Sequence, residues 1–170
     1  MNKDHIRQKN LAIRKTLNQD IASSVIVSKI LSLEEFCLAK NVLIFHPLKS
    51  EINLLPLLKI SGKNFYLPKV SGDNLLICPY TGELEKGSFG IFEPKAEPIL
   101  DLSNIEVAFI PCLAIDKNLN RIGYGKGYYD RLFLRKDFFA KKIAVINKEL
   151  MTDEIDVDKF DIKVDSYITD

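Results

Sequence analysis

Short, uninterrupted apolar runs recur along the chain and limit the folds that it can adopt. The clearest runs occupy residues 42–45, 107–110 and 143–146. Runs of this kind are typical of strands that are buried on both faces, because no position in them is left polar for contact with water. Such strands occur mainly in parallel sheets that have helices on either side. The runs therefore favour the α/β class of folds.

The segments between these runs predict the remaining elements. Amphipathic or apolar stretches at helical spacing indicate helices, and shorter β-rich stretches indicate strands. Helices are expected over residues 6–17, 21–33 and 54–60 and from about Tyr128, and further strands at residues 65–67, 75–78 and 164–168. Strands that alternate with helices predict a single domain, residues 1–170, with a three-layer α/β/α architecture around a mainly parallel central sheet.

Several connections in this scheme are candidates for a binding site. Residues 79–98 hold three of the seven prolines together with three glycines, and we expect a long functional or irregular loop there. In open α/β sheets, ligands bind beyond the carboxyl ends of the strands. The connections 45–51, 110–127 and 146–161 all leave such ends. We therefore expect these three connections to share one cleft.

The overall charge excludes some classes of partner. The net charge is +1 and the isoelectric point is about 7.6, so no overall field favours nucleic acid or an anionic membrane.

The sequence shows no membrane-spanning pattern. The longest apolar run, residues 107–115, is too short to cross a bilayer and contains Pro111. The first residues are polar and charged rather than an apolar signal. These features predict a cytoplasmic protein.

The cysteines and histidines offer no obvious metal or redox site. Cys37, Cys78 and Cys112 are widely spaced and form no Cys-x-x-Cys pair, which fits a reducing compartment. Each lies between apolar neighbours, so we expect all three to be packed in the interior. The only histidines, His5 and His46, are too far apart in sequence to suggest a histidine metal site.

The densest cluster of chemical features is the block of residues 121–130, Arg-Ile-Gly-Tyr-Gly-Lys-Gly-Tyr-Tyr-Asp. Alternating glycines let backbone N–H groups approach an anion and form a concave nest for it. Arg121 and Lys126 add full positive charges. Asp130 follows at a position suited to hold Mg²⁺ against phosphate oxygens. The block therefore indicates a nucleoside triphosphate site.

The glycines alone would leave another interpretation open. Gly-x-Gly-x-Gly is also common in plain mobile turns, and the block matches neither of the standard phosphate-loop motifs. The flanking cations, the paired tyrosines and the following acid favour a site over a plain turn.

The block also belongs to a longer pattern that resembles the 5-formyltetrahydrofolate cyclo-ligase family, also called 5,10-methenyltetrahydrofolate synthetases. The resemblance extends over nearly the whole chain. It is carried by Lys3-x-x-Ile6-Arg7, Glu51-Ile52-Asn53, Phe89-Gly90-Ile91-x-Glu93-Pro94, Pro111-x-Leu113-x-x-Asp116, the Asn-Arg-Ile-Gly-Tyr-Gly-Lys-Gly-Tyr-Tyr-Asp-Arg sequence of residues 120–131, and Asp161-x-Lys163-x-Asp165. The glycine–tyrosine block is the most specific of these pieces, and the shorter ones add weight through their order.

The resemblance implies an ATP site and two catalytic cations. The implied ATP-binding residues are Lys3, Asp4, His5, Ile6, Arg7, Arg121, Ile122, Gly123, Tyr124, Gly125, Lys126, Gly127, Tyr128 and Tyr129. Arg121 and Lys126 would neutralise phosphate oxygens while glycine N–H groups cradle them. For Lys3 and Arg7, a solvated basic helix face is the alternative that the residues alone leave open.

The resemblance also implies a Mg²⁺ site at Asp130 and Asp161. Two carboxylates suit Mg²⁺, because this ion keeps several waters and binds substrate phosphates rather than an all-protein cage. For Asp161 a surface acid is the alternative, since acidic residues surround it and only the Asp-x-Lys-x-Asp register selects it.

The implied folate-binding residues are His46, Glu51, Tyr124, Gly125, Lys126, Gly127 and Tyr128. Glu51 would accept hydrogen bonds from pterin N–H groups, whereas His46 departs from the residue type of the family. The tyrosines offer flat surfaces for pterin or adenine, although Tyr129 also has the helical spacing of a core residue with Leu132 and Phe133. The turn at residues 89–94 would close over the folate, with Glu93 as a polar contact.

The activity implied by the resemblance is conversion of 5-formyltetrahydrofolate to 5,10-methenyltetrahydrofolate, with ATP and Mg²⁺, by a monomer that acts on small molecules. The formyl oxygen would be phosphorylated and N10 would then close the ring. A non-catalytic module that binds nucleotide, folate or RNA on the same fold remains the alternative. A sugar-phosphate or CoA enzyme would fit the sheet but not the block at residues 121–130.

Overall fold

The computed structural model describes residues 2–170 and contains a central six-stranded sheet. The strand order is β10-β9-β6-β1-β2-β3. These strands are β1 (Asn41–Leu43), β2 (Asn64–Ser71), β3 (Asn74–Pro79), β6 (Val107–Pro111), β9 (Lys141–Val145) and β10 (Ser166–Ile168). From β10 to β2 every neighbouring pair is parallel, and only β3 runs antiparallel, as the second strand of a hairpin with β2. The predicted mainly parallel sheet is confirmed.

The three apolar runs form the adjacent central strands β1, β6 and β9, where both faces of the sheet are covered. Successive side chains of a strand point to opposite faces. Val107 and Phe109 of β6 accordingly pack with Ile26 of helix α2 (Gln19–Leu31), whereas Ala108 and Ile110 pack with Leu132 of helix α4 (Tyr128–Phe133). A strand with two buried faces has no position for a polar side chain, which explains its uninterrupted apolar sequence.

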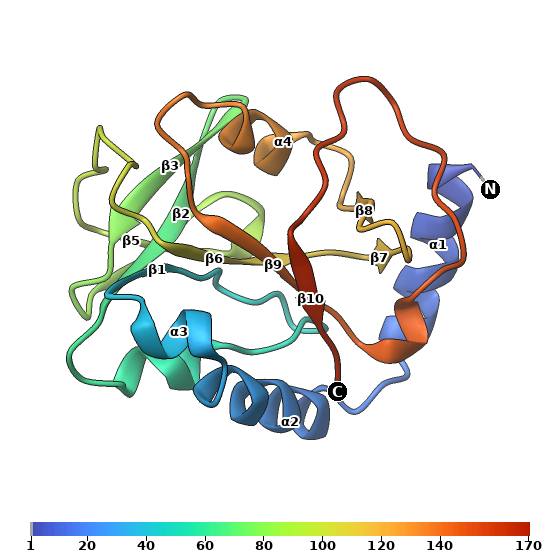
Figure 1. Cartoon of the computed structure of the whole chain (residues 1–170), viewed down its shortest axis with the longest axis horizontal. Helices are drawn as coiled ribbons and strands as arrows, with labels where there is room; N and C mark the ends of the chain where they lie inside the picture. Colours follow the sequence, from blue (N-terminus) through green and yellow to red (C-terminus); the bar gives the residue numbers. More distant parts are fainter. Residues whose placement is uncertain (1) are drawn as a thin grey trace.

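The helices complete the layers around this sheet. They are α1 (Lys3–Arg14), α2 (Gln19–Leu31), α3 (Glu34–Leu38) and α4 (Tyr128–Phe133). Figure 1 shows α2 and α3 along one face, α4 on the other, and α1 beside the small hairpin of β7 (Ala114–Ile115) and β8 (Arg121–Ile122). Side-chain oxygens of Asn2 and Asn18 cap the N-termini of α1 and α2. Within residues 2–170, no helix combines the length and the apolar character needed to cross a bilayer.

Two local predictions were wrong. Residues 79–98 contain a second small hairpin, β4 (Leu84–Lys86) and β5 (Phe92–Pro94), around the 3-10 turn η2 (Ser88–Gly90). The hairpin is fixed to the sheet because buried Glu93 accepts a hydrogen bond from the Val70 N–H at 3.0 Å. Gly87 leaves the space that the Glu93 side chain fills, since a Cβ there would lie 2.1 Å from Glu93 Cδ.

The helix predicted over residues 54–60 is the second wrong prediction, because these residues form only the 3-10 turn η1 (Leu55–Lys59). Another such turn, η3 (Lys148–Leu150), follows β9.

The cysteines follow the packing prediction in two of three cases. Cys78 and Cys112 are buried free thiols, and burial raises the pKa of Cys112 to about 12, which makes it unreactive. Cys37 is exposed, because the short helix α3 buries only Phe36.

Candidate active site

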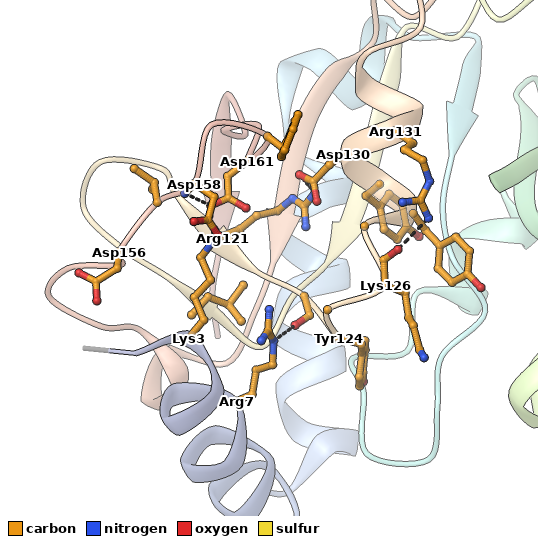
Figure 2. Close-up of a pocket in the computed structure, with 18 of the residues that line it drawn as sticks. Lys3, Arg7, Arg121, Tyr124, Lys126, Asp130, Arg131, Asp156, Asp158 and Asp161 are labelled. Carbon is orange, nitrogen blue, oxygen red and sulfur yellow. Dashed lines mark hydrogen bonds and ion pairs between the residues drawn. The ribbon is translucent and has the colours of Figure 1, made fainter. Parts of the chain in front are cut away.

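A cleft of about 1330 Å³ opens at the carboxyl end of β6. Three segments that are far apart in sequence line it: the start of α1, residues 121–131, and the acidic loop 156–161. Figure 2 shows Lys3, Arg7, Arg121, Asp130 and Asp161 from these segments around one space. The charged side chains of these segments therefore lie beyond the carboxyl end of a parallel strand, which is where the sequence predicted a binding site.

Gly125 and Gly127 give the loop before α4 its shape. Their φ angles are 87° and 68°, a left-handed conformation that other residues adopt only under strain. Gly127 is the residue before the first turn of α4, which begins at Tyr128 as predicted. Two guanidinium groups hold the loop by its carbonyl oxygens: Arg7 Nε donates to Gly123 O at 3.0 Å, and Arg131 Nη2 donates to Lys126 O at 2.7 Å.

Arg121 is almost completely buried beneath this loop. Its side chain is 5% exposed, and Nη2 donates to Asp130 Oδ1 at 2.8 Å. The guanidinium lies 5.9 Å from the ring centre of Tyr129 and 5.2 Å from that of Phe133, within the range of cation–π attraction. Arg121 Nε is buried and has no hydrogen-bond partner among residues 2–170. This donor is the kind of group that a bound anion would satisfy.

A second ion pair lies beside the first in the cleft. Lys3 Nζ donates to Asp158 Oδ2 at 2.6 Å and also to Asp161 Oδ2. Burial lowers the pKa of Lys3, but the bonds to both carboxylates outweigh it, so the pKa is raised. Burial alone would raise the pKa of Asp161. The hydrogen bonds from Lys3 and from the Asp158 N–H outweigh burial, so the pKa of Asp161 is lowered. Both shifts favour the charged pair.

Asp130 and Asp161 come from neighbouring segments of this cleft. The backbone N–H of Ile162, next to Asp161, donates to Asp130 Oδ1 at 3.2 Å. Across residues 2–170, no group of three or more carboxylate, histidine or cysteine side chains is placed to hold a metal ion. A site with two carboxylates beside several cations suits Mg²⁺ that arrives with phosphate oxygens and water. The donor set therefore fits the Mg²⁺–nucleotide complex expected from the sequence.

The remaining loop side chains have different surroundings. Lys126 is exposed at the cleft and, in the described part of the chain, forms no ion pair. The hydroxyl of Tyr128 donates to Gly72 O at 3.3 Å, and the Tyr129 ring packs against Phe133 at 6.0 Å. Both tyrosine rings line the cleft while part of each packs on the protein.

Two predicted folate residues lie outside the cleft lining. Glu51 is 7% exposed, and its Oε1 accepts a hydrogen bond from the Tyr124 hydroxyl at 2.6 Å. The His46 ring packs against Phe92 of the small hairpin, with ring centres 5.4 Å apart and ring planes tilted by 45°, and burial lowers the pKa of His46. Tyr124 itself lines the cleft and is 42% exposed. The expected common cleft is therefore incomplete, because Tyr124 separates connection 45–51 from the other two.

Only some of the predicted ATP-binding residues of the N-terminal segment line the cleft. Lys3, Asp4 and Arg7 line the cleft, and Arg7 Nη1 pairs with Asp4 Oδ1 at 2.5 Å. His5 is exposed outside the lining, and Ile6 is buried in a core cluster with Ala114, Ile122 and Ile155. The place of Ile6 in this cluster fixes α1 against β7 and β8.

Sequence reasoning missed two arginines that shape the site. Arg14 is 4% exposed, and its Nη2 donates to the Tyr124 hydroxyl at 2.6 Å. Its position seven residues after Arg7 places both on one helix face, a signal that was present in the sequence. Arg131 ends the motif of residues 120–131, but its bond to Lys126 O could not be foreseen, because it depends on the left-handed turn at Gly127.

Comparison with known proteins identifies the family. The model of the 5-formyltetrahydrofolate cyclo-ligase family matches residues 1–170. The 5-formyltetrahydrofolate cyclo-ligase of Haemophilus influenzae is 32% identical over 186 residues, covering 96% of this chain and 100% of that protein. The probable 5-formyltetrahydrofolate cyclo-ligase of Schizosaccharomyces pombe is 30% identical over 172 residues, covering 88% of this chain and 84% of that protein.

Solved structures agree with the fold. The 5,10-methenyltetrahydrofolate synthetase of Aquifex aeolicus superposes with a TM-score of 0.85 at 32% identity, covering 98% of this chain and 89% of that one. The synthetase of Mycoplasma pneumoniae superposes with a TM-score of 0.81 over 99% of both chains, and at 22% identity it supports the fold alone.

Proposed function

We propose that this chain, which belongs to the 5-formyltetrahydrofolate cyclo-ligase family, converts 5-formyltetrahydrofolate and ATP to 5,10-methenyltetrahydrofolate, ADP and phosphate. Membership of this family makes the chain an enzyme of the ligase class. The observation that carries the ATP-dependent reaction is the meeting of Lys3, Arg7, Arg121 and Lys126 around two carboxylates in one cleft. A polyanion with a divalent cation matches that charge pattern.

The chemical problem is that the formyl group is an amide, whose oxygen is a poor leaving group. Transfer of the γ-phosphoryl group of ATP to that oxygen would convert it to a phosphate ester. N10 would then attack the activated carbon, and phosphate would depart with the C–O bond electrons while the N10 proton is released. Such a sequence needs positioning and charge neutralisation rather than a protein nucleophile.

The residues of the cleft would divide this work. Exposed Lys126 and buried Arg121 would neutralise the transferred phosphoryl oxygens, and Lys3 and Arg7 would bind the rest of the triphosphate. Asp130 and Asp161 would hold Mg²⁺, which neutralises phosphate charge when bound. Glu51 would accept hydrogen bonds from the pterin N–H groups. Since one chain supplies all these groups, we expect a monomer, and the three free thiols fit the cytoplasm.

The test is to mix the purified protein with 5-formyltetrahydrofolate, ATP and Mg²⁺ and to follow the near-ultraviolet absorbance of the methenyl product. We expect a rise in absorbance that requires all three components and that matches the ADP released. Absence of product from a folded protein that binds both substrates would overturn the proposal and favour the non-catalytic binding module.

A further inference from the structure

Three polar side chains meet where α1, connection 45–51 and the glycine loop come together. The Tyr124 hydroxyl donates to Glu51 Oε1 at 2.6 Å and accepts from Arg14 Nη2 at 2.6 Å. Arg14 Nη1 lies 3.7 Å from the same Glu51 oxygen, and its guanidinium lies 5.5 Å from the Tyr124 ring centre. Burial, together with the adjacent Glu51 carboxylate, raises the pKa of the Tyr124 hydroxyl, so it remains a donor.

Each oxygen of the Glu51 carboxylate already accepts one hydrogen bond in this arrangement. Its Oε2 accepts the backbone N–H of Leu48 at 2.8 Å, and its Oε1 is taken by Tyr124. The small cavity that Glu51 lines together with Phe45 and Cys112 measures about 10 Å³, which holds one water molecule at most. That cavity is too small for a folate, so the large cleft that Tyr124 lines is the space from which we expect a ligand to approach Glu51.

Tyr124 is also part of the wall of the large cleft, with its ring half-exposed there. Its neighbours in sequence are Gly123 and Gly125, which lack side chains that would hinder rotation of the ring. The carbonyl of Gly123 is held by Arg7, so the backbone has an anchor, and the side chain is held by the hydrogen bonds of its hydroxyl to Glu51 and Arg14. Displacement of the hydroxyl would join the cleft to the Glu51 site.

We propose that Tyr124 is a specificity-determining residue, whose hydroxyl occupies the Glu51 oxygen until a flat heterocycle with adjacent N–H donors displaces it. This inference rests on the proposed function, because it takes Glu51 as the pterin acceptor. A ligand with one weak donor cannot replace a hydrogen bond to a charged carboxylate, whereas paired N–H donors can. The displaced phenol then lies over the bound ring as an aromatic surface.

The first test is the dissociation constant of 5-formyltetrahydrofolate measured by calorimetry without ATP. Tyr124→Phe keeps the ring and removes the competing hydroxyl, so we expect binding about tenfold tighter than in the wild type. Tyr66→Phe is the matched control, because its hydroxyl contacts Asn41 at 3.4 Å, away from the cleft, and we expect no change. Unchanged or weaker binding by Tyr124→Phe would overturn the proposal.

The second test observes the wild-type protein directly and does not depend on the folding of a variant. The chain has six tyrosines and no tryptophan, so ¹³Cζ-tyrosine labelling gives a small set of signals. We expect the Tyr124 signal to shift when 5-formyltetrahydrofolate binds and the Tyr66 signal to stay. A stationary Tyr124 signal in the folate complex would contradict displacement.

The two proposals fail in distinguishable ways. A wild-type protein that neither binds nor converts 5-formyltetrahydrofolate refutes the proposed function and with it the role of Tyr124. A wild-type protein that converts the folate, with Tyr124→Phe binding it no more tightly, refutes only the role of Tyr124.

Discussion

Arg121 donates to Asp130 at 2.8 Å from a side chain that is 5% exposed, so the expected phosphate-binding cation already neutralises the expected metal-binding acid. Lys3 and Asp161 repeat this relationship in the neighbouring ion pair. A buried charge without a partner is costly, and these pairs keep the site compensated before any ligand arrives. In a Mg²⁺–nucleotide complex, the phosphates would pair with Arg121 and Lys3, and the metal would pair with Asp130 and Asp161. Binding would therefore replace the present ion pairs with new ones and would leave no buried charge without a partner.

Asp130→Asn tests this exchange. The amide can still accept a hydrogen bond from Arg121 but carries no charge, so we expect a loss of about 1–3 kcal/mol in the free energy of unfolding. Turnover should fall at least about tenfold and need more Mg²⁺, because one metal ligand is lost. Urea denaturation and a Mg²⁺ titration of activity measure the two effects. Asp153→Asn, in the same acidic region but exposed, is the control. Unchanged Mg²⁺ dependence in Asp130→Asn would exclude it as a ligand.

Lys126→Ala tests the exposed cation of the glycine loop. Because Lys126 lacks an ion-pair partner within residues 2–170, we expect stability to change by less than about 0.5 kcal/mol. Turnover should fall about 100-fold or more if its charge stabilises the transferred phosphoryl group. Lys136→Ala, another exposed lysine outside the cleft lining, should retain wild-type activity. Full activity in Lys126→Ala would refute this role.

The acid stability of the protein should depend in part on Asp137, which lies away from the cleft. Hydrogen bonds from Arg135 and then from the Leu102 N–H lower the pKa of Asp137 from 3.8 to about 2. Because the folded-state pKa is depressed, this stabilisation is complete above pH 3.8 and is lost as the pH falls towards about 2.

Asp137→Asn should therefore destabilise the protein near neutral pH and converge with the wild type in acid. The side chain is 30% exposed, so screening limits the effect to about 1 kcal/mol or less. Denaturation curves of both proteins at several acidic pH values measure it. A difference that stays constant as the pH falls would contradict the assignment.

Much of the fold could be predicted because it follows from short-range sequence patterns. The apolar run 107–110 predicts a doubly covered strand, and α4 begins at Tyr128 as the glycine pattern indicated. The hairpin of β4 and β5 escaped prediction because its stability depends on Glu93 reaching Val70, a contact 23 residues away that local composition does not reveal. Proline and glycine content alone favoured an irregular loop there.

The candidate site, like the fold, could be predicted only in part from the sequence. The motif at residues 121–130 and the basic start of α1 could be placed together through family resemblance, and the cleft contains both. The contact between Glu51 and Tyr124 could not be foreseen, because it joins side chains 73 residues apart through one rotamer of an exposed ring. Patterns in a sequence indicate which residue types gather at a sheet edge, but side-chain pairing there depends on the packed structure.

Asp116 links the fold to the site and supplies the last prediction. It is completely buried and accepts hydrogen bonds from the N–H groups of Asn118, Asn120 and Ile155 and from the Asn120 amide, at 2.9–3.1 Å. Burial raises its pKa, but these bonds, led by those from Asn120, outweigh it, so the pKa is lowered and the carboxylate is charged. Asp116 thereby ties the turn before Arg121 to Ile155, the residue before the acidic loop.

Asp116→Ala removes every one of these acceptors and leaves buried N–H groups unpaired, so we expect a loss of about 3 kcal/mol or more. Asp116→Asn keeps the shape and one acceptor oxygen, and it should lose less. Because Arg121 follows the turn directly and the acidic loop contains Asp161, ATP affinity measured on the folded Asp116→Asn protein should also weaken. Denaturation and calorimetry measure the two losses. Unaltered ATP affinity, with the expected loss of stability, would show that Asp116 supports the fold without positioning the cleft.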